Sequence, residues 1–150
     1  MKNFAQLGFM VLMLSLSACQ STSDASTAAS GSSAQLHNTL WKLTGMNGKA
    51  VQNLQGQRMA SLTLSSEQSR ARIATACNSG SAAFTLNGNA IKFAATMSTK
   101  MGCEPVLMQQ EAAIFKVIAD TTRYEIKGET LELYNASNKL LASFQAENVK

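Results

Sequence analysis

The sequence predicts a mainly β domain of the α+β kind: a small antiparallel β-barrel or curled sheet of seven to eight strands, with one helix near 105–119. Three observations support this fold class. Apolar and polar residues alternate over short segments, which is the period of a half-buried strand. Glycine and asparagine separate these segments, as they do where a chain reverses direction between antiparallel strands. Only one segment has the apolar spacing of a helix instead.

Eight segments show the alternation expected of strands. They are residues 39–44, 60–64, 70–74, 83–86, 90–93, 124–126, 131–134 and 140–144. Asn87-Gly88, between the fourth and fifth segments, is a strong hairpin signal because this pair readily adopts the positive φ angles of a tight turn. Residues 127–129 join the next two segments in the same way. In 70–74, Arg70 and Arg72 fall on one face of the strand and the apolar residues on the other.

The helical segment contains one apolar face. That face consists of Leu107, Ile114, Phe115 and Ile118, with Met108 beside it. Pro105 suits the first turn, where its missing N–H has no partner to lose. Glu104 is favourable at the positive end of the helix dipole. We expect this helix to cover an opening or an edge of the curled sheet.

Residues 1–18 have the layout of an export signal. Lys2 gives a positive start, and the apolar run that follows is too short to span a bilayer, which needs about 20 residues. The run ends in Leu16-Ser17-Ala18-Cys19, which resembles a lipobox, the motif whose cysteine receives a thioether-linked diacylglycerol. We therefore expect cleavage before Cys19 and a membrane anchor through it. An ordinary secretory signal with a chance cysteine is the alternative.

The lipidated cysteine and a flexible linker are expected to occupy residues 19–35. The linker is mostly Ser, Thr, Ala and Gly, and such a segment cannot bury enough apolar surface to fold. Residues 36–150 are then one domain's worth of chain, expected to be a monomer. Several acyl chains on one residue anchor stably. Gln20, in place of the aspartate that retains enteric lipoproteins in the inner membrane, favours the outer membrane and its periplasmic face.

The charge pattern argues against a nucleic-acid partner. The formal net charge is +4, but the basic residues are scattered and form no run of five or six. Export makes such a partner less plausible still. The expected partners are the membrane and an unidentified envelope protein or hydrophobic ligand, and no cofactor is expected.

Cys77 and Cys103 remain as an even pair once Cys19 is assigned to lipid. Disulfides persist in an oxidising compartment. A bridge here would close 26 residues and stabilise the fold by about 3–4 kcal/mol. Two free thiols or a pair of metal ligands are the alternatives. His37 is the only histidine and no CxxC occurs, so a zinc site has too few ligands and no metal site is expected.

Three blocks of residues resemble a known family. They are Leu40-Trp41-Lys42-Leu43 with Asn47-Gly48-Lys49, Ala76-Cys77-Asn78 with Gly80, Ser81 and Phe84, and Ser98-Thr99-Lys100-Met101-Gly102-Cys103 with Pro105 and Glu111. In these blocks, over nearly all of 36–146, the chain resembles the META domain family and its HslJ-type heat-shock lipoproteins of Gram-negative bacteria. It departs from the family at Ala76, where a glycine is common, and at Ser79-Gly80, where an Arg-Phe pair is common. The resemblance implies a small β-rich fold, a role in envelope stress and, in some relatives, drug tolerance, but no known reaction.

No catalytic constellation is apparent in the sequence. His37 precedes the first strand and is expected to be solvated. Neither a GxSxG elbow nor a glycine-rich phosphate loop occurs. Glu104 and Glu111 form a conceivable carboxylate pair. The favoured interpretation is that one caps the helix start and the other is solvated or bonds a backbone group.

Four residues are candidates for a binding or structural role: Asn78, Thr99, Met101 and Glu111. Asn78 and Thr99 lie close to the two cysteines, and their short polar side chains can satisfy backbone groups at a strand end or turn. Four methionines could line an adaptable groove, although ordinary core filling is favoured. They are Met59, Met97, Met101 and Met108.

These features predict a non-enzymatic, membrane-anchored envelope lipoprotein that supports outer-membrane integrity or stress and drug tolerance. The alternative is a small-barrel binding module for a hydrophobic ligand, or an inhibitor of an envelope enzyme. A large apolar cavity under the helix would favour the hydrophobic ligand.

Overall fold

The computed structural model describes residues 33–51 and 56–147. The predicted signal peptide, Cys19 and most of the predicted linker lie outside the described residues. Gly31–Lys150 forms one compact unit. Since this unit contains its own buried core, it meets the requirement for a domain that folds by itself.

The described part of the chain contains ten strands and one helix. In chain order they are β1 (Leu40–Met46), β2 (Lys49–Ala50), β3 (Ser61–Ser65), β4 (Arg70–Ala74), β5 (Ser79–Asn87), β6 (Ala90–Phe93), β7 (Met97–Ser98), α1 (Pro105–Asp120), β8 (Arg123–Lys127), β9 (Thr130–Tyr134) and β10 (Leu140–Glu147). All eight predicted strands and the helix are present. The two-residue strands β2 and β7 were not predicted.

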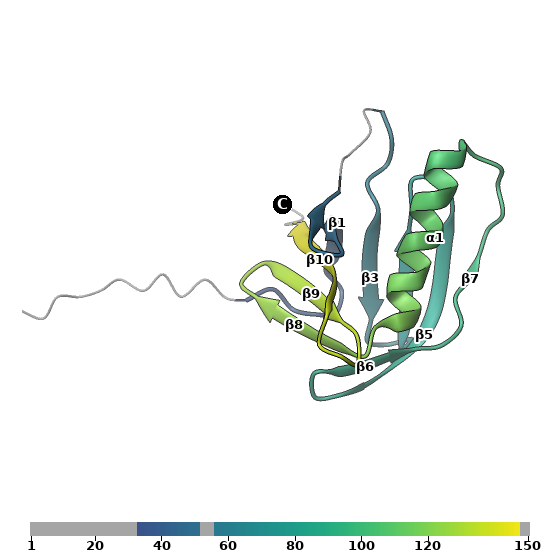
Figure 1. Ribbon diagram of the computed structural model, residues 1–150. Coiled ribbons are helices and arrows are strands. Elements are labelled where there is room, and N and C mark those ends of the chain that lie inside the picture. Colours follow the sequence, from purple (N-terminus) through teal and green to yellow (C-terminus); the bar gives the residue numbers. More distant parts are fainter. Residues whose placement is uncertain (1–32, 52–55, 148–150) are drawn as a thin grey trace, which may run out of the picture. The chain divides into compact units, whose positions relative to one another are not determined.

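Eight of these strands close into an antiparallel barrel, which confirms the predicted fold class (Figure 1). The order around the barrel is β1, β3, β4, β5, β6, β8, β9 and β10, and β10 pairs back onto β1. Closure removes the exposed sheet edges that would otherwise invite pairing with another chain. The short strands add to the rim, β2 beside β1 and β7 beside β5.

The core of the barrel is a single cluster of apolar side chains. Its largest fully buried members are Trp41, Leu62, Leu64, Ile91, Ile118, Leu131 and Leu133. Trp41 is the bulkiest, and its indole N–H donates a hydrogen bond to the carbonyl oxygen of Leu36 at 3.0 Å. Burial of this tryptophan is favourable because its large apolar ring leaves water while its N–H keeps a hydrogen-bond partner.

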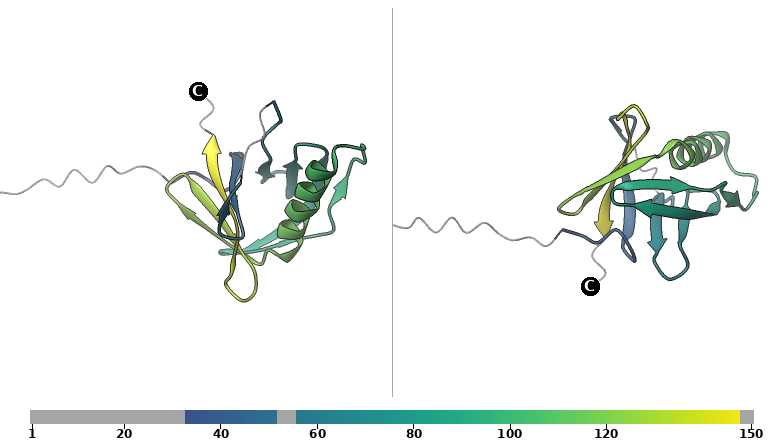
Figure 2. Two further views of the ribbon diagram at one scale, coloured as in Figure 1. Left: turned by 45° about the horizontal axis from the view of Figure 1, so that its top comes forward. Right: turned by 90° about the horizontal axis from the view of Figure 1, so that it is seen from below.

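The strand pairing of the barrel is weakest between β6 and β8, and helix α1 contacts β6. The β6–β8 seam has one register pair, Ala90 with Arg123. Along its length the helix lies beside β5 and β7 (Figures 1 and 2). Pro105 occupies the first turn, as predicted. No helix in the described part of the chain is long and apolar enough to span a membrane.

The predicted apolar face of α1 is largely correct, with two exceptions. Leu107, Ile114 and Ile118 are buried and Phe115 is partly buried. Val117 is buried although it was not predicted. Met108, expected beside the apolar face, is 49% exposed.

The helix approaches β5 so closely that Gly80 has no room for a side chain. A Cβ at Gly80 would lie 2.8 Å from Cε1 of Phe115 and 2.9 Å from Cγ2 of Thr96. Real Cβ contacts are longer, so the Phe115 ring or the backbone would have to move. Packing of the helix onto the strand therefore depends on the absence of a side chain at this position.

Gly80→Ala is expected to lower the free energy of unfolding by about 1–3 kcal/mol, because it overpacks a buried contact. Gly102→Ala is the matched control: a Cβ there meets nothing within 4 Å, and the φ angle is not positive. Urea unfolding of both variants checks the prediction. Equal midpoints for the two variants would show that α1 does not need the close approach.

The residues before β1 are already part of the fold. The Ala34 N–H donates to the Gly128 carbonyl at 2.8 Å, and Leu36 is buried. The expectation of a solvated His37 is wrong. Its ring is half-buried and stacks on Phe84 with 6.0 Å between centroids, because the segment pairs with Leu64 of β3 rather than extending into solvent.

Candidate functional site

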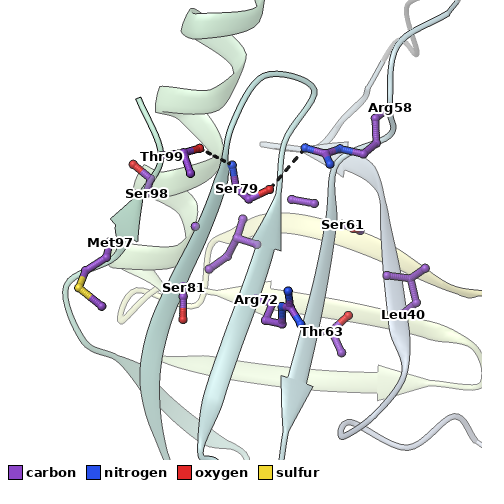
Figure 3. A pocket seen from close by; sticks show the side chains of 13 residues that line it. Leu40, Arg58, Ser61, Thr63, Arg72, Ser79, Ser81, Met97, Ser98 and Thr99 are labelled. Carbon is purple, nitrogen blue, oxygen red and sulfur yellow. Dashed lines mark hydrogen bonds between the residues drawn. The ribbon is translucent and has the colours of Figure 1, made fainter. Parts of the chain in front are cut away.

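The outer face of β3, β4 and β5 carries an open groove with a volume of about 710 Å³, which we call the outer groove (Figure 3). Its lining residues are Leu40, Arg58, Ser61, Thr63, Arg72, Ile73, Ala74, Ser79, Gly80, Ser81, Met97, Ser98 and Thr99. A second cavity of about 290 Å³ shares Thr63, Arg72 and Ser81 with it and adds Arg70. The two cavities are therefore one continuous concave surface.

Strand register explains why this face is hollow. Thr63 pairs with Arg72, and Arg72 pairs with Ser81, so the arginine is flanked by a hydroxyl on each side. The core neighbours Leu62, Ile73 and Ala82 face inward, as alternation along a strand requires. Because the flanking side chains are small, the long Arg72 side chain lies in a depression rather than in a packed layer.

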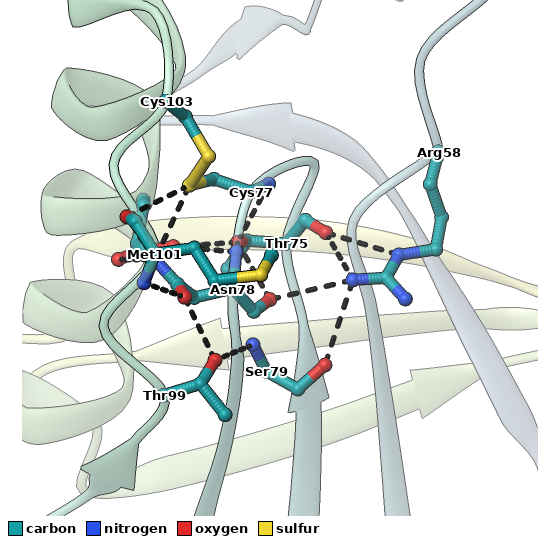
Figure 4. Close-up of a disulfide and its surroundings, with 9 residues drawn as sticks. Arg58, Thr75, Cys77, Asn78, Ser79, Thr99, Met101 and Cys103 are labelled. Atoms are coloured by element: carbon teal, nitrogen blue, oxygen red, sulfur yellow. Dashed lines mark hydrogen bonds between the residues drawn. A yellow bond between two sulfur atoms is a disulfide. The ribbon is translucent and has the colours of Figure 1, made fainter.

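Strand β7 forms one wall of the outer groove. A disulfide between Cys77 and Cys103, whose Cα atoms are 6.0 Å apart, ties this part of the chain to the barrel (Figure 4). This is the bridge expected from the sequence. It joins the β4–β5 connection to the residue just before Glu104, which is the N-cap of α1. The bridge therefore fixes the segment that runs from β7 to the helix.

Asn78 organises the polar network around this disulfide and is only 3% exposed. Its side-chain oxygen accepts hydrogen bonds from the Thr99 hydroxyl at 2.7 Å and from the Met101 N–H at 2.9 Å. Its side-chain amide donates to the Glu111 carboxylate at 3.1 Å and to the Met101 carbonyl at 3.4 Å. All four residues singled out in the sequence thus meet in one network.

Glu111 links this network to the helix. Its carboxylate also accepts hydrogen bonds from the Asn78 backbone N–H at 2.9 Å and from the Thr75 hydroxyl at 2.8 Å. This agrees with the expectation that one of the two glutamates bonds a backbone group. Glu104 makes no side-chain capping bond, so the expected cap at the helix start is not formed.

Arg58 joins the network to the outer groove. Its guanidinium donates to the Thr75 carbonyl from Nε at 3.1 Å and from Nη2 at 2.9 Å. Nη2 also reaches the Asn78 carbonyl and the Ser79 hydroxyl, each at 3.5 Å. The arginine is therefore held in place at one end of the groove while part of its guanidinium still faces the groove.

The network around the disulfide has the character of a structural brace. Every buried side-chain nitrogen and oxygen in the described residues has a hydrogen-bond partner. Buried polar groups that satisfy one another stiffen a site rather than leaving an acid, base or nucleophile free to react. No three acidic, histidine or cysteine residues come together as metal ligands within the described ranges.

The favoured interpretation of the methionines as core residues is wrong for three of the four. Met97, Met101 and Met108 are 65%, 59% and 49% exposed, whereas Met59 is half-buried. The backbone of Met101 is bound to Asn78, and this turns its side chain away from the core. Met97 forms part of the groove wall.

A second polar cluster lies on the β8–β9 hairpin. The Tyr134 hydroxyl donates to the Glu132 carboxylate at 2.7 Å, and Lys127 donates to the same carboxylate at 2.9 Å. These two bonds, the tyrosine first, hold the pKa of Glu132 below its ordinary value. The same contact raises the pKa of Tyr134, since ionisation would place two negative charges together.

Tyr134→Phe is expected to raise the pKa of Glu132 towards its ordinary value of 4.5, because the largest stabilising bond to the carboxylate is lost. A depressed folded-state pKa contributes stability that is present above 4.5 and is lost as the pH falls through the folded value. The variant should therefore lose less stability than the wild type between neutral pH and acid. NMR titration of the Glu132 carboxyl carbon in the variant and in the wild type measures the change in its pKa. An unchanged pKa would contradict the assigned cause.

Comparison with known proteins places the domain in a family. The META domain model matches residues 34–148, so the chain belongs to the META domain family. The search of curated proteins gives no significant match.

Two solved structures resemble the fold. The NMR structure of a protein from Burkholderia xenovorans has a TM-score of 0.61 and 21% identity, over 75% of this chain and 84% of that one. A second NMR structure has a TM-score of 0.58 and 20% identity, over 74% of this chain and 91% of the other. At this level of identity the likeness concerns the fold alone.

Proposed function

We propose that this META domain protein is a membrane-anchored envelope lipoprotein that acts by binding rather than catalysis and supports outer-membrane integrity under stress. One observation carries the binding role. The polar residues near the disulfide are occupied with one another, while the outer groove beside them is open and concave. An open groove with convergent polar groups is typical of a binding site.

The lipobox at Cys19 and the linker after it support the anchoring part of the proposal. Two or more acyl chains on one residue hold a protein stably on a membrane. Small residues in the linker give a flexible tether that lets the domain reach ligands near the membrane surface. Outer-membrane location at the periplasmic face remains part of this proposal.

A hydrophobic ligand inside the barrel gains no support from the described residues. Trp41, Leu62 and Leu131 are fully buried and meet in the one core cluster. The outer groove lies on the outer face and is lined by arginines and hydroxyls together with apolar residues such as Leu40 and Met97. We therefore place the binding role on the outer groove.

The Cys19→Ser variant tests the anchor and the role together. A deletion strain is expected to be more sensitive to heat, detergent and antibiotics, and the wild-type chain should restore resistance. The Cys19→Ser chain should lose fatty-acid labelling and fail to restore it, although the folded domain is unaltered. Persistent labelling would refute the lipobox, and a deletion strain with unchanged sensitivity would refute the stress role.

A further inference from the structure

We propose that the outer groove binds a phosphate ester carried on a hydroxyl-rich body, such as a phosphorylated saccharide or the headgroup of an anionic glycerophospholipid. This inference deepens the proposed function and rests on its binding role. It concerns the chemistry of the ligand, which the fold family does not specify.

The charge of the groove favours an anion. Arg58, Arg70 and Arg72 line the two continuous cavities, and no aspartate or glutamate is among their described lining residues. Glu67 lies in the β3–β4 turn but outside both linings. Glu111 accepts its hydrogen bonds from Thr75 and Asn78. No carboxylate in the described lining therefore offsets the positive charge of the groove.

Arg72 is the residue best placed to bind the ligand. Its side chain is exposed at the centre of the groove, and no described residue forms a hydrogen bond or ion pair with it. A guanidinium presents two parallel N–H groups that match two oxygens of a phosphate. Arg58 adds a second guanidinium whose position is already fixed by the Thr75 carbonyl, so little further ordering is needed.

The hydroxyls around Arg72 suit a polyol. Ser61, Thr63, Ser79 and Ser81 face the groove from β3 and β5. Each hydroxyl can donate and accept, which matches the mixed donors and acceptors of a sugar or glycerol. The groove volume of about 710 Å³ falls within the usual range of ligand sites.

The absence of aromatic side chains from the described lining argues against a nucleic acid as the occupant. Proteins that bind single strands stack bases on aromatic rings. A sugar phosphate or lipid headgroup has no base to stack. Met97, which is 65% exposed at the groove wall, can contact the C–H groups of such a ligand.

The first arm of the test uses the ¹⁵N-labelled Gly31–Lys150 unit, which contains its own core. Titration with fructose 1,6-bisphosphate is expected to shift amide signals of β3, β4 and the first half of β5. Fructose, which has the hydroxyls but no phosphate, should shift none of them. No saturable shift at millimolar bisphosphate would overturn the proposal unless the lipid arm shows binding.

Arg72→Gln is the decisive variant. Loss of one charge-assisted, two-pronged contact is expected to weaken binding about tenfold. Lys92→Gln is the control, since it removes the same charge from an exposed position on β6 outside the two cavities of the groove. It should leave the dissociation constant unchanged. Equal weakening by both variants would mean non-specific attraction to net charge and would overturn the site.

The second arm distinguishes the source of the phosphate. Vesicles of phosphatidylglycerol should sediment the unit if the ligand is a lipid headgroup, while phosphatidylcholine vesicles, which carry a cationic choline, should not. Binding of the bisphosphate alone identifies a soluble phosphorylated saccharide. Both arms use the purified unit, so failure of both would show that the ligand assignment is wrong. The stress role is tested separately by the phenotype of the deletion strain.

Discussion

Replacing Cys77 and Cys103 with serine in the Gly31–Lys150 unit is expected to lower the free energy of unfolding by about 3–4 kcal/mol. The bridge spans 26 residues, and the chain-entropy model gives this magnitude for a loop of that length. The effect is large because the bridge ties two parts of the chain that are joined otherwise by the Asn78 network and two β5–β7 register pairs. Urea unfolding of the variant and the wild type measures the difference.

The control for this prediction is the wild-type unit under a reductant. Its unfolding midpoint should fall by a similar amount, because reduction breaks the same bond without changing any other atom of the side chains. The unit lacks Cys19, so a thiol count on denatured, unreduced protein should be zero. Two reactive thiols, or equal midpoints with and without reductant, would contradict the bridge.

Asn78→Ala is expected to lower the free energy of unfolding by about 2–4 kcal/mol. The alanine leaves the Met101 N–H and the Thr99 hydroxyl without their buried acceptor, and it removes a donor to Glu111. These bonds are part-buried, so water replaces the lost acceptor only incompletely, and members of one network lose stability together. Denaturant unfolding gives the magnitude.

Asn135→Ala provides a matched control for this loss. Asn135 also accepts two backbone N–H bonds, from Ser137 and Lys139, but in an exposed turn between β9 and β10. Water can replace its bonds, so a loss of about 0.5–1 kcal/mol is expected. Hydrogen exchange adds a local readout: the Met101 amide should exchange faster in Asn78→Ala and not in Asn135→Ala. An unchanged Met101 rate would mean that Asn78 does not hold the segment.

Local patterns were sufficient to predict most of the fold. Alternation and the Asn87-Gly88 turn identify strands directly, because side-chain direction along a strand depends only on the sequence nearby. The sequence did not predict strands β2 and β7, because two residues are too few to show alternation of apolar and polar residues. Val117 escaped because its burial depends on how α1 lies against the barrel, which the spacing of apolar residues does not determine.

The candidate site was likewise predicted only in part. Asn78, Thr99, Met101 and Glu111 were found through their proximity to the cysteines and through the family motifs, and the structure brings them together. The outer groove was missed although Arg72 was correctly placed on the outward face. A groove requires three strands in a fixed register and a wall from β7, and these contacts join residues far apart in sequence. The hydroxyls on successive outward positions of β3 and β5 were the available signal.

If the outer groove binds the proposed ligand, the disulfide determines when the domain becomes competent to bind. The β7 wall of the outer groove is held by the brace around Cys77 and Cys103. In a reducing compartment the two thiols stay apart and the wall depends on its hydrogen bonds alone. A newly made chain would then carry an unfinished ligand surface, which is completed only after oxidation. Under the proposed export and binding role, bond formation would thus separate synthesis of the chain from completion of its ligand surface.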